Sequence, residues 1–287
     1  MTTRRIVLCL SCPDAPGIVA DVVRFLFEAG LNIAESAQFL DRGTNRFFMR
    51  VVADPVGTAA PVDLESLRAA FVPLSSRRGM DWQAHDPARR ARALVMVSRF
   101  DHCLNDLLYR YGIGALPIEI PAVVSNHSDS YRQVAALGIP YHHWPVTPAN
   151  KAAQERKLLE VCEEQAIDLI VLARYMQVLS PDLCARYAGR IINIHHSFLP
   201  SFKGAKPYHQ AHARGVKLIG ATAHYVTPDL DEGPIIEQDV ARVDHAMSPD
   251  DLAALGRDVE NVVLARAVRW HAEHRVMPNG QKTVVFR

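Results

Sequence analysis

Short apolar runs alternate with amphipathic stretches along the whole chain, and this alternation predicts its elements. In the first 85 residues, period-two runs favour strands and 3.6-residue periodicity favours helices, with turn signals between them. The predicted order is strand 4–11, helix 17–29, strand 32–41, strand 45–53, helix 61–73 and strand 79–84. This βαββαβ order predicts a ferredoxin-like domain.

A polar stretch interrupts this pattern around residue 85. The sequence HDPARRARA contains Pro87 and three arginines, a composition typical of a linker. We therefore predict a small domain over residues 1–84, a linker over 85–91 and a larger domain over 92–287.

The larger domain is predicted to hold a mostly parallel sheet with helices on both faces, a Rossmann-like α/β fold. Helix-length amphipathic segments separate its apolar runs, which is the pattern of parallel strands joined by helices. The apolar runs are 93–97, 118–125, 139–144, 169–172 and 191–194. Two more strands are expected at 217–226 and 234–242, with helices near 206–213 and over 249–274.

Composition narrows the partners to small molecules. The formal net charge is only +1 and no basic run is present, so the sequence lacks the electrostatic features of a nucleic-acid binder. No apolar run approaches the roughly 20 residues that span a membrane. The five cysteines are an odd number scattered over a long chain, which favours a reducing, cytoplasmic location.

The strongest chemical signal lies where the apolar run 191–194 ends. Asn193, His195 and His196 lie there, and ligands collect at the carboxyl ends of strands in open α/β sheets. An amide can donate to an oxyanion, and an imidazole can move a proton near neutral pH. The loop after strand 217–226 carries Asp229, Asp231 and Glu232, which could supply a carboxylate.

These residues resemble the formyltransferase family that uses 10-formyltetrahydrofolate. The resemblance covers roughly residues 92–287. It rests on Asn193-Ile194-His195, Ser197, Leu199-Pro200, Gly204, His224-Tyr225-Val226-Thr227 and Leu230-Asp231-Glu232-Gly233-Pro234. It implies that Asn193 and His195 polarise the formyl carbonyl, while Asp231 orients His195 and helps to move protons.

The resemblance also implies a folate pocket beside the segment LARYMQVLSP, residues 172–181. Backbone groups of this segment and of the loop 227–231 are expected to bind the pterin. The implied folate-binding residues are Met176, Gln177, Val178, Leu179, Thr227, Pro228, Asp229 and Leu230.

The acceptor of the formyl group is predicted to be water. The family's ribonucleotide-using member has a glycine- and serine-rich phosphate loop where this chain has Phe100 and Asp101, whose bulk and charge make a poor phosphate cradle. The segment VSNHSD, 124–129, and the doublet His195-His196 resemble the 10-formyltetrahydrofolate deformylases. That branch hydrolyses its substrate to tetrahydrofolate and formate, without a metal or other cofactor, in the supply of formate for purine synthesis and the balance of the one-carbon folate pool.

The first domain resembles an ACT domain, a regulatory module that often binds amino acids. The resemblance lies in PDAPGIVADV, residues 13–22, and implies an effector site at Asp14, Gly17 and Ile18. Glycine and methionine are the expected effectors, and a homo-oligomer is the expected assembly.

Three alternatives stay open from the sequence. A formyltransferase could use an unidentified amine, and a non-catalytic sensor could bind folate or an amino acid. A metal-dependent hydrolase could draw its ligands from His195, His196, His209, His212, His224 and Asp231. Within the favoured reading, His196 is expected to be secondary to His195, because successive residues leaving a strand point in opposite directions.

Overall fold

The structure is a computed structural model that describes residues 2–57, 61–198 and 207–287. The chain divides into two compact units. The N-terminal unit comprises Met1–Arg90, Glu273–Asn279 and Val284–Arg287, and the main unit comprises Ala91–Ala272 and Gly280–Thr283.

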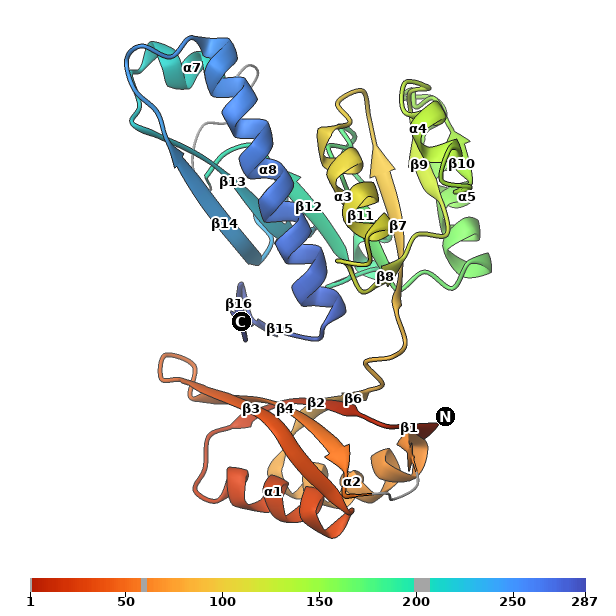
Figure 1. Cartoon of the computed structure of the whole chain (residues 1–287), viewed down its shortest axis with the longest axis vertical. Helices are drawn as coiled ribbons and strands as arrows, with labels where there is room; N and C mark the ends of the chain where they lie inside the picture. The colour runs from red at the N-terminus through yellow and green to blue at the C-terminus, as the bar shows by residue number, and fades with distance from the viewer. Residues whose placement is uncertain (1, 58–60, 199–206) are drawn as a thin grey trace. The chain divides into compact units, whose positions relative to one another are not determined.

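The N-terminal unit contains the predicted ferredoxin-like arrangement, which is confirmed. An antiparallel four-stranded sheet in the order β3-β4-β2-β6 has two helices on one face (Figure 1). Its elements are β2 (Ile6–Pro13), α1 (Ile18–Glu28), β3 (Leu31–Asp41), β4 (Arg46–Pro55), α2 (Leu64–Arg78) and β6 (Asp81–His85). A short pair, β1 (Thr2–Thr3) with β5 (Val62–Asp63), lies beside them.

Both faces of this sheet are covered, which explains why β2 is apolar almost throughout. Leu8 and Leu10 pack with the helices in one core cluster. Val7 and Cys9, of the opposite parity, pack with Met277 in a second cluster. Alternate residues of a strand face opposite sides, so a continuous apolar run indicates burial on both faces.

The second cover comes from the end of the chain, where the strands β15 (Val276–Asn279) and β16 (Lys282–Val285) pair. Arg50, 5% exposed, donates from Nε to the His274 carbonyl at 3.1 Å and from Nη2 to the Glu273 carbonyl at 3.1 Å. The sequence-based division assigned these last residues to the larger domain. They group with the N-terminal unit because their apolar side chains are buried on its sheet.

The main unit is built on a sheet in the order β10-β9-β7-β11-β12-β13-β14, with β8 paired to β7. The pairs from β10 to β12 are parallel, while β12-β13 and β13-β14 are antiparallel. The strands are β7 (Ala91–Val97), β8 (Ile118–Glu119), β9 (Val123–Ser125), β10 (Tyr141–His143), β11 (Leu169–Leu172), β12 (Ile191–His195), β13 (Leu218–Tyr225) and β14 (Ile235–Arg242). The mostly parallel α/β sheet expected from the sequence is confirmed, although the run 118–125 is divided into β8 and β9 around Pro121, which has no N–H to donate.

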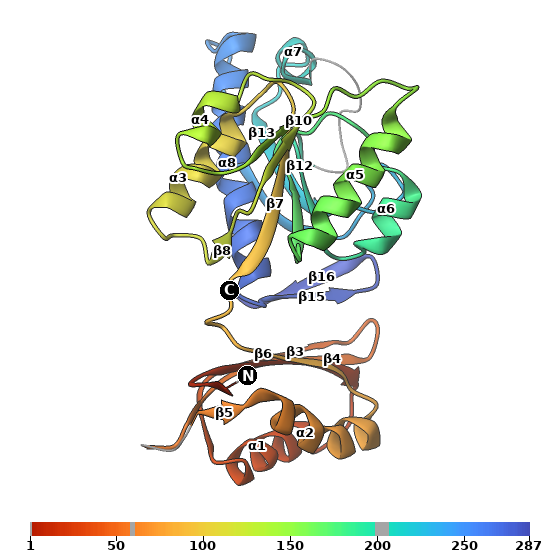
Figure 2. The same ribbon diagram turned by 90° about the vertical axis from the view of Figure 1, so that its right-hand side faces the viewer.

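Helices cover both faces of this sheet, as Figure 2 shows, with α5 and α6 on one side and α3 and α8 on the other. Leu158 of α5 and Leu183 of α6 share a buried cluster with strand residues such as Leu94 and Ile170. The helices are α3 (His102–Gly112), α4 (Tyr131–Ala135), α5 (Lys151–Glu164), α6 (Pro181–Arg186), α7 (Pro207–Ala213) and α8 (Pro249–Ala272).

Two capped helix starts fix segments near the strand ends. The Ser180 hydroxyl accepts from the Leu183 N–H at 3.3 Å, which ends the loop after β11 and begins α6. At α8, Ser248 and Asp251 cap each other, because the Ser248 N–H donates to the Asp251 carboxylate and the Asp251 N–H to the Ser248 hydroxyl. Such reciprocal bonds satisfy N–H groups that a helix start leaves unpaired.

Candidate active site

A cavity of about 390 Å³ lies where the loops after β11, β12 and β13 meet. Leu172, Val178 and Val226 line it with apolar surface. Its polar groups come from the strands β12 and β13 and from the loops that follow the strands. Its polar residues include Arg174, Asn193, His195, His196, His224 and Asp231. The structure therefore brings the three predicted catalytic residues, Asn193, His195 and Asp231, to one cavity.

His195 and Asp231 form the central contact of the site. The Nδ1 atom of His195 lies 3.3 Å from the Asp231 carboxylate, with side chains 11% and 21% exposed. The hydrogen bond from His195 is the largest cause that holds the pKa of Asp231 well below its usual range. Asp231 is therefore an anion at neutral pH and keeps the His195 proton on Nδ1 when the ring is neutral.

The backbone at Asp231 is strained. Its φ of 58° lies in the left-handed region, which is uncommon for a residue with a side chain. Close packing beside it fixes the loop, because a Cβ added to Gly233 would overlap the carbonyl oxygen of Tyr225. The motif glycine thus lets the loop return tightly against β13 and present the Asp231 carboxylate.

His224 is a further candidate residue of the site, which the sequence indicated only as part of a motif and of the metal alternative. It lies opposite Asn193 in the β12–β13 ladder. Its Nδ1 lies 2.9 Å from the Tyr225 carbonyl and its Nε2 lies 3.3 Å from Asn193 Nδ2. With Nδ1 donating to the carbonyl, Nε2 of the neutral ring accepts from the Asn193 amide and so orients it.

His196 does not point away from His195, so that part of the parity argument is wrong. The two rings are stacked with centroids 4.8 Å apart and planes 24° apart, and both residues line the cavity. Strand β12 ends at His195, and alternation no longer applies to a residue in the bend that follows. The relative importance of the two imidazoles remains a prediction.

A buried ionic network lies behind His196. Arg174 Nη1 is 3.0 Å from His196 Nδ1, and Arg174 Nε is 3.4 Å from the carboxylate of Glu260, which is 1% exposed. His102 and the Tyr208 hydroxyl reach the same carboxylate at 2.9 and 2.8 Å. Burial alone would raise the pKa of Glu260, but the His102 hydrogen bond and the Arg174 charge outweigh it and lower the pKa.

All eight expected folate-binding residues line the cavity. Some of their polar groups are already engaged, because the Met176 N–H donates to the Ser98 hydroxyl at 2.9 Å and the Thr227 hydroxyl to the Asp229 carbonyl at 3.1 Å. Leu230 is 64% exposed and Val178 55% exposed, so both leave apolar surface for a ligand to cover.

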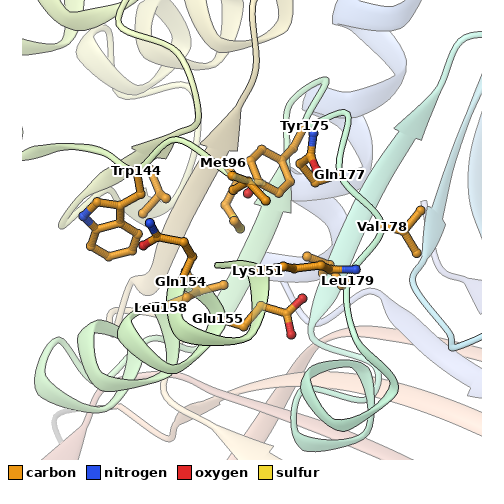
Figure 3. Close-up of a pocket in the computed structure, with 12 residues that line it drawn as sticks. Met96, Trp144, Lys151, Gln154, Glu155, Leu158, Tyr175, Gln177, Val178 and Leu179 are labelled. Atoms are coloured by element: carbon orange, nitrogen blue, oxygen red, sulfur yellow. The ribbon is translucent and has the colours of Figure 1, made fainter. Parts of the chain in front are cut away.

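A second, smaller hollow lies along the segment 175–179, between Tyr175, Trp144 and the side chains of α5 (Figure 3). Its volume is about 20 Å³, which is room for about one water molecule. Of these two hollows, only the larger cavity, which also contains the imidazoles, has room for a pterin-sized ligand.

Four residues of the metal alternative, His195, His196, His224 and Asp231, line the cavity, but among the described residues no three of them bring ligand atoms within 4.8 Å of one another. The group of three potential ligand atoms in the described part of the chain is His102, Cys103 and Glu260. Burial raises the pKa of Cys103 well above its usual value, so the thiol stays protonated, and Arg174 already neutralises Glu260. These residues fit a divalent cation poorly.

The expected effector residues lie at the start of α1 in the N-terminal unit. Gly17 precedes the helix with a φ of 86°, which favours glycine, and Ile18 is buried as the first helical residue. The Asp14 N–H donates to the Asn45 carbonyl. Arg78, which the sequence analysis missed, donates to the Pro16 carbonyl at 3.2 Å and to Asp21 at 2.6 Å, so a cation lies at this turn.

Comparisons with known proteins agree with this arrangement. The formyl transferase family profile matches residues 91–268, more than half of the chain, and the ACT domain profile matches residues 5–63. A formyltetrahydrofolate deformylase of Corynebacterium sp. (strain P-1) is 50% identical over 99% of this chain and 98% of that protein. The chain belongs to the formyltetrahydrofolate deformylase family.

Solved structures separate the deformylase family from the transferases. A crystal structure of a formyltetrahydrofolate deformylase from Burkholderia mallei is 53% identical, with a TM-score of 0.94 over 99% of this chain and 100% of that one. Glycinamide ribonucleotide transformylase 1 from Symbiobacterium toebii is 30% identical, with a TM-score of 0.64 over 69% of this chain and 95% of that one. The predicted family membership and the predicted hydrolase class are both confirmed. Over the residues that the structure describes, none of the helices is both long and apolar enough to cross a bilayer.

Proposed function

We propose that this deformylase hydrolyses 10-formyltetrahydrofolate to tetrahydrofolate and formate through His195, Asn193 and Asp231. One observation carries the assignment of roles. The ionised Asp231 holds His195 Nδ1, while His195 Nε2 is buried without a hydrogen-bond partner among the described residues, in the cavity that Asn193 also lines.

In the first step, water attacks the formyl carbon. His195 Nε2 takes a proton from the water while Asp231 stabilises the charge that develops on the ring. The formyl oxygen becomes an oxyanion, and the Asn193 amide, oriented by His224, donates to it.

In the second step, the tetrahedral intermediate breaks its bond to N10. The proton on His195 Nε2 passes to the departing nitrogen, which gives tetrahydrofolate, and the carbonyl re-forms as formic acid, which ionises to formate and releases its proton to solvent. One water is consumed, and the imidazole returns to its starting state.

An assay without any amine tests this function. Purified protein and 10-formyltetrahydrofolate should give formate and tetrahydrofolate in a one-to-one ratio. Turnover that appears only after addition of an amine, such as glycinamide ribonucleotide, would show a transferase. Turnover that a chelator removes and added metal restores would show the metal-dependent alternative.

The absence of a phosphate cradle supports water over a phosphorylated acceptor. In the segment after β7, the Phe100 side chain is 54% exposed and the Asp101 carboxylate accepts from Gln133 at 2.6 Å. A bulky ring and a fixed carboxylate at this place disfavour a bound phosphate.

The N-terminal unit is proposed to regulate this hydrolysis by binding an amino acid at Asp14, Gly17 and Ile18. The Arg78 guanidinium beside this turn offers a cation to the effector carboxylate. Glycine and methionine are the proposed effectors, since both are tied to one-carbon metabolism. We further propose a cytoplasmic homo-oligomer that supplies formate for purine synthesis and balances the folate pool, with light scattering as the test of assembly.

A further inference from the structure

Two ring nitrogens of the candidate site have no partner in the described part of the chain. The Nε2 atoms of His195 and His196 are both buried, and neither has a hydrogen-bond partner among the residues that the structure describes. Buried polar atoms are nearly always paired, and leaving one unpaired costs about 1–3 kcal/mol. Two such atoms on stacked rings that line one cavity indicate a shared polar ligand.

The two rings carry their protons on different nitrogens. His195 Nδ1 faces the Asp231 carboxylate at 3.3 Å, so in the neutral ring the proton lies on Nδ1 and Nε2 accepts. His196 Nδ1 faces Arg174 Nη1 at 3.0 Å, and a guanidinium can only donate. The proton of His196 therefore lies on Nε2.

His196 stays neutral at physiological pH. Burial, then the charge of Arg174 and then nearby His195, lower the pKa of His196 to about 4, against smaller opposing effects of Glu260 and Asp231. The site thus offers one acceptor, His195 Nε2, and one donor, His196 Nε2–H.

Arg174 is itself fixed in place. Its backbone has a φ of 66°, its carbonyl accepts from the Ser98 N–H at 3.2 Å, and its guanidinium lies against Glu260. His102 Nε2 lies 2.9 Å from Oε2 of Glu260, the same oxygen that Arg174 Nε approaches, and the Tyr208 hydroxyl donates to Oε1, so the carboxylate beside Arg174 is itself held in place.

We propose that Arg174, held by Glu260, keeps the His196 proton on Nε2, and that this N–H and the unprotonated His195 Nε2 together hold the water that attacks the formyl carbon. This inference rests on the proposed hydrolysis and specifies how its nucleophile is bound. The water oxygen accepts from His196 Nε2–H, and one of its O–H groups donates to His195 Nε2. Its second lone pair forms the bond to the formyl carbon as His195 takes the proton.

In this arrangement His196 contacts the nucleophile and is a catalytic residue. Arg174 and Glu260 act through it and are positioning residues. A nucleophile other than water does not depend on the hydrogen bond from His196 for its position. His196 should therefore raise the rate of attack by water more than the rate of attack by other nucleophiles.

Partitioning between water and hydroxylamine tests the proposal. Hydroxylamine attack gives formohydroxamate and tetrahydrofolate, whereas water gives formate and tetrahydrofolate. In His196→Phe, which keeps a ring of similar shape, we expect formate production to fall about 10²-fold and KM for the folate to change less than about threefold. Enzyme-dependent hydroxamate production should fall less than about fivefold, measured above the background without enzyme.

The outcomes separate this inference from the proposed function. If the wild-type protein releases no formate, the proposed hydrolysis itself is wrong. If the wild type releases formate but His196→Phe lowers formate and hydroxamate equally, or lowers neither, only the water-holding role is wrong.

A second variant covers the case in which His196→Phe does not fold. His196→Gln keeps an N–H donor at about the reach of Nε2, and we expect formate production within about tenfold of the wild type. A loss of about 10²-fold or more in folded His196→Gln would contradict a donor role.

Nitrogen-15 spectra of labelled histidines test the positioning residues directly. In the wild-type protein, His196 should be protonated on Nε2. The signal of His196 is identified as the one that disappears from the spectrum of a His196 variant. Glu260→Gln removes the charge that fixes Arg174, so the Nδ1–H form of His196 should increase at least about twofold. A wild-type His196 protonated on Nδ1 would overturn the proposal.

Discussion

Each unit of this protein contains a stacked pair of histidines, and the two pairs differ in their other contacts. In the N-terminal unit, His85 and His274 are stacked with centroids 3.6 Å apart and planes 6° apart. In the main unit, the His195 and His196 rings are 4.8 Å apart and 24° from parallel. Burial lowers the pKa of His85 and that of His196 to about 4.

The difference lies in the charged groups that face each pair. After burial, the pKa of His85 is lowered by the cations Arg68 and Arg89. In the main unit, a carboxylate faces His195, and a guanidinium faces His196. Stacking and burial therefore make a neutral imidazole, whereas an adjacent fixed charge decides which nitrogen can react.

The largest effect should come from removing the charge that faces His195. Asp231→Asn keeps the shape but removes the anion, so we expect kcat to fall by at least about 10²-fold while folate still binds. Asn193→Ala should lose about 10²-fold or more, because the oxyanion loses a donor. Steady-state formate release and folate titration measure both, and near-normal turnover in either folded variant would refute its role.

Alanine at one histidine of each pair should separate chemistry from packing. We expect His195→Ala to lose about 10²-fold or more of kcat, and to lose more than His196→Ala. His85→Ala should lower the melting temperature of the protein while kcat changes less than about threefold. Larger losses for His196→Ala than for His195→Ala would mean that the other imidazole is the base.

The packing of residues 273–287 can be tested at Arg50. Arg50→Met removes two buried hydrogen bonds, to the carbonyls of Glu273 and His274, so we expect the free energy of unfolding to fall by about 2 kcal/mol. Arg5 in the same unit pairs with Asp54 at an exposed site, where its side chain is 55% exposed. Arg5→Met should therefore cost less than about 1 kcal/mol, and equal losses in urea unfolding would contradict the buried role of Arg50.

Both pairs should make stability depend on pH in the same direction. Unfolded histidine takes up a proton below pH about 6.5, whereas folded His85 and His196 do so only near pH 4. The unfolded state thus binds more protons between these values, and the free energy of unfolding should fall as the pH drops from about 6.5 to about 4. His85→Phe and His196→Phe should each flatten this dependence, and unchanged slopes would show that neither ring stays neutral on folding.

The smallest effect should appear at the turn before α1. Glycine or methionine should change turnover of the intact enzyme by a few-fold at most, and Gly17→Ala should abolish the response. Alanine is strained at a φ of 86°, and its Cβ would lie 3.2 Å from the Arg78 guanidinium. If neither amino acid alters turnover or melting temperature in the intact enzyme, an assembly role is the better explanation of this unit.

The sequence by itself determined most of the elements and the identity of the central site residues. Alternating polarity predicted the βαββαβ unit and the parallel strands because this periodicity depends only on near neighbours. The helix predicted over 249–274 is α8, which spans Pro249–Ala272. Asn193, His195 and Asp231 came from spaced motifs, and the structure places all three at one cavity.

Only the tertiary structure decided which distant side chains meet. The pattern along the chain put residues 273–279 in the larger domain, whereas they group with the N-terminal unit. They pack on a sheet formed more than 200 positions earlier, and the contact between Arg50 and His274 spans 224 residues. His196 turns onto His195 because β12 ends there, and Arg174 reaches Glu260 from another element. Local periodicity has no information about such contacts, since burial and charge pairing between remote segments are fixed by packing.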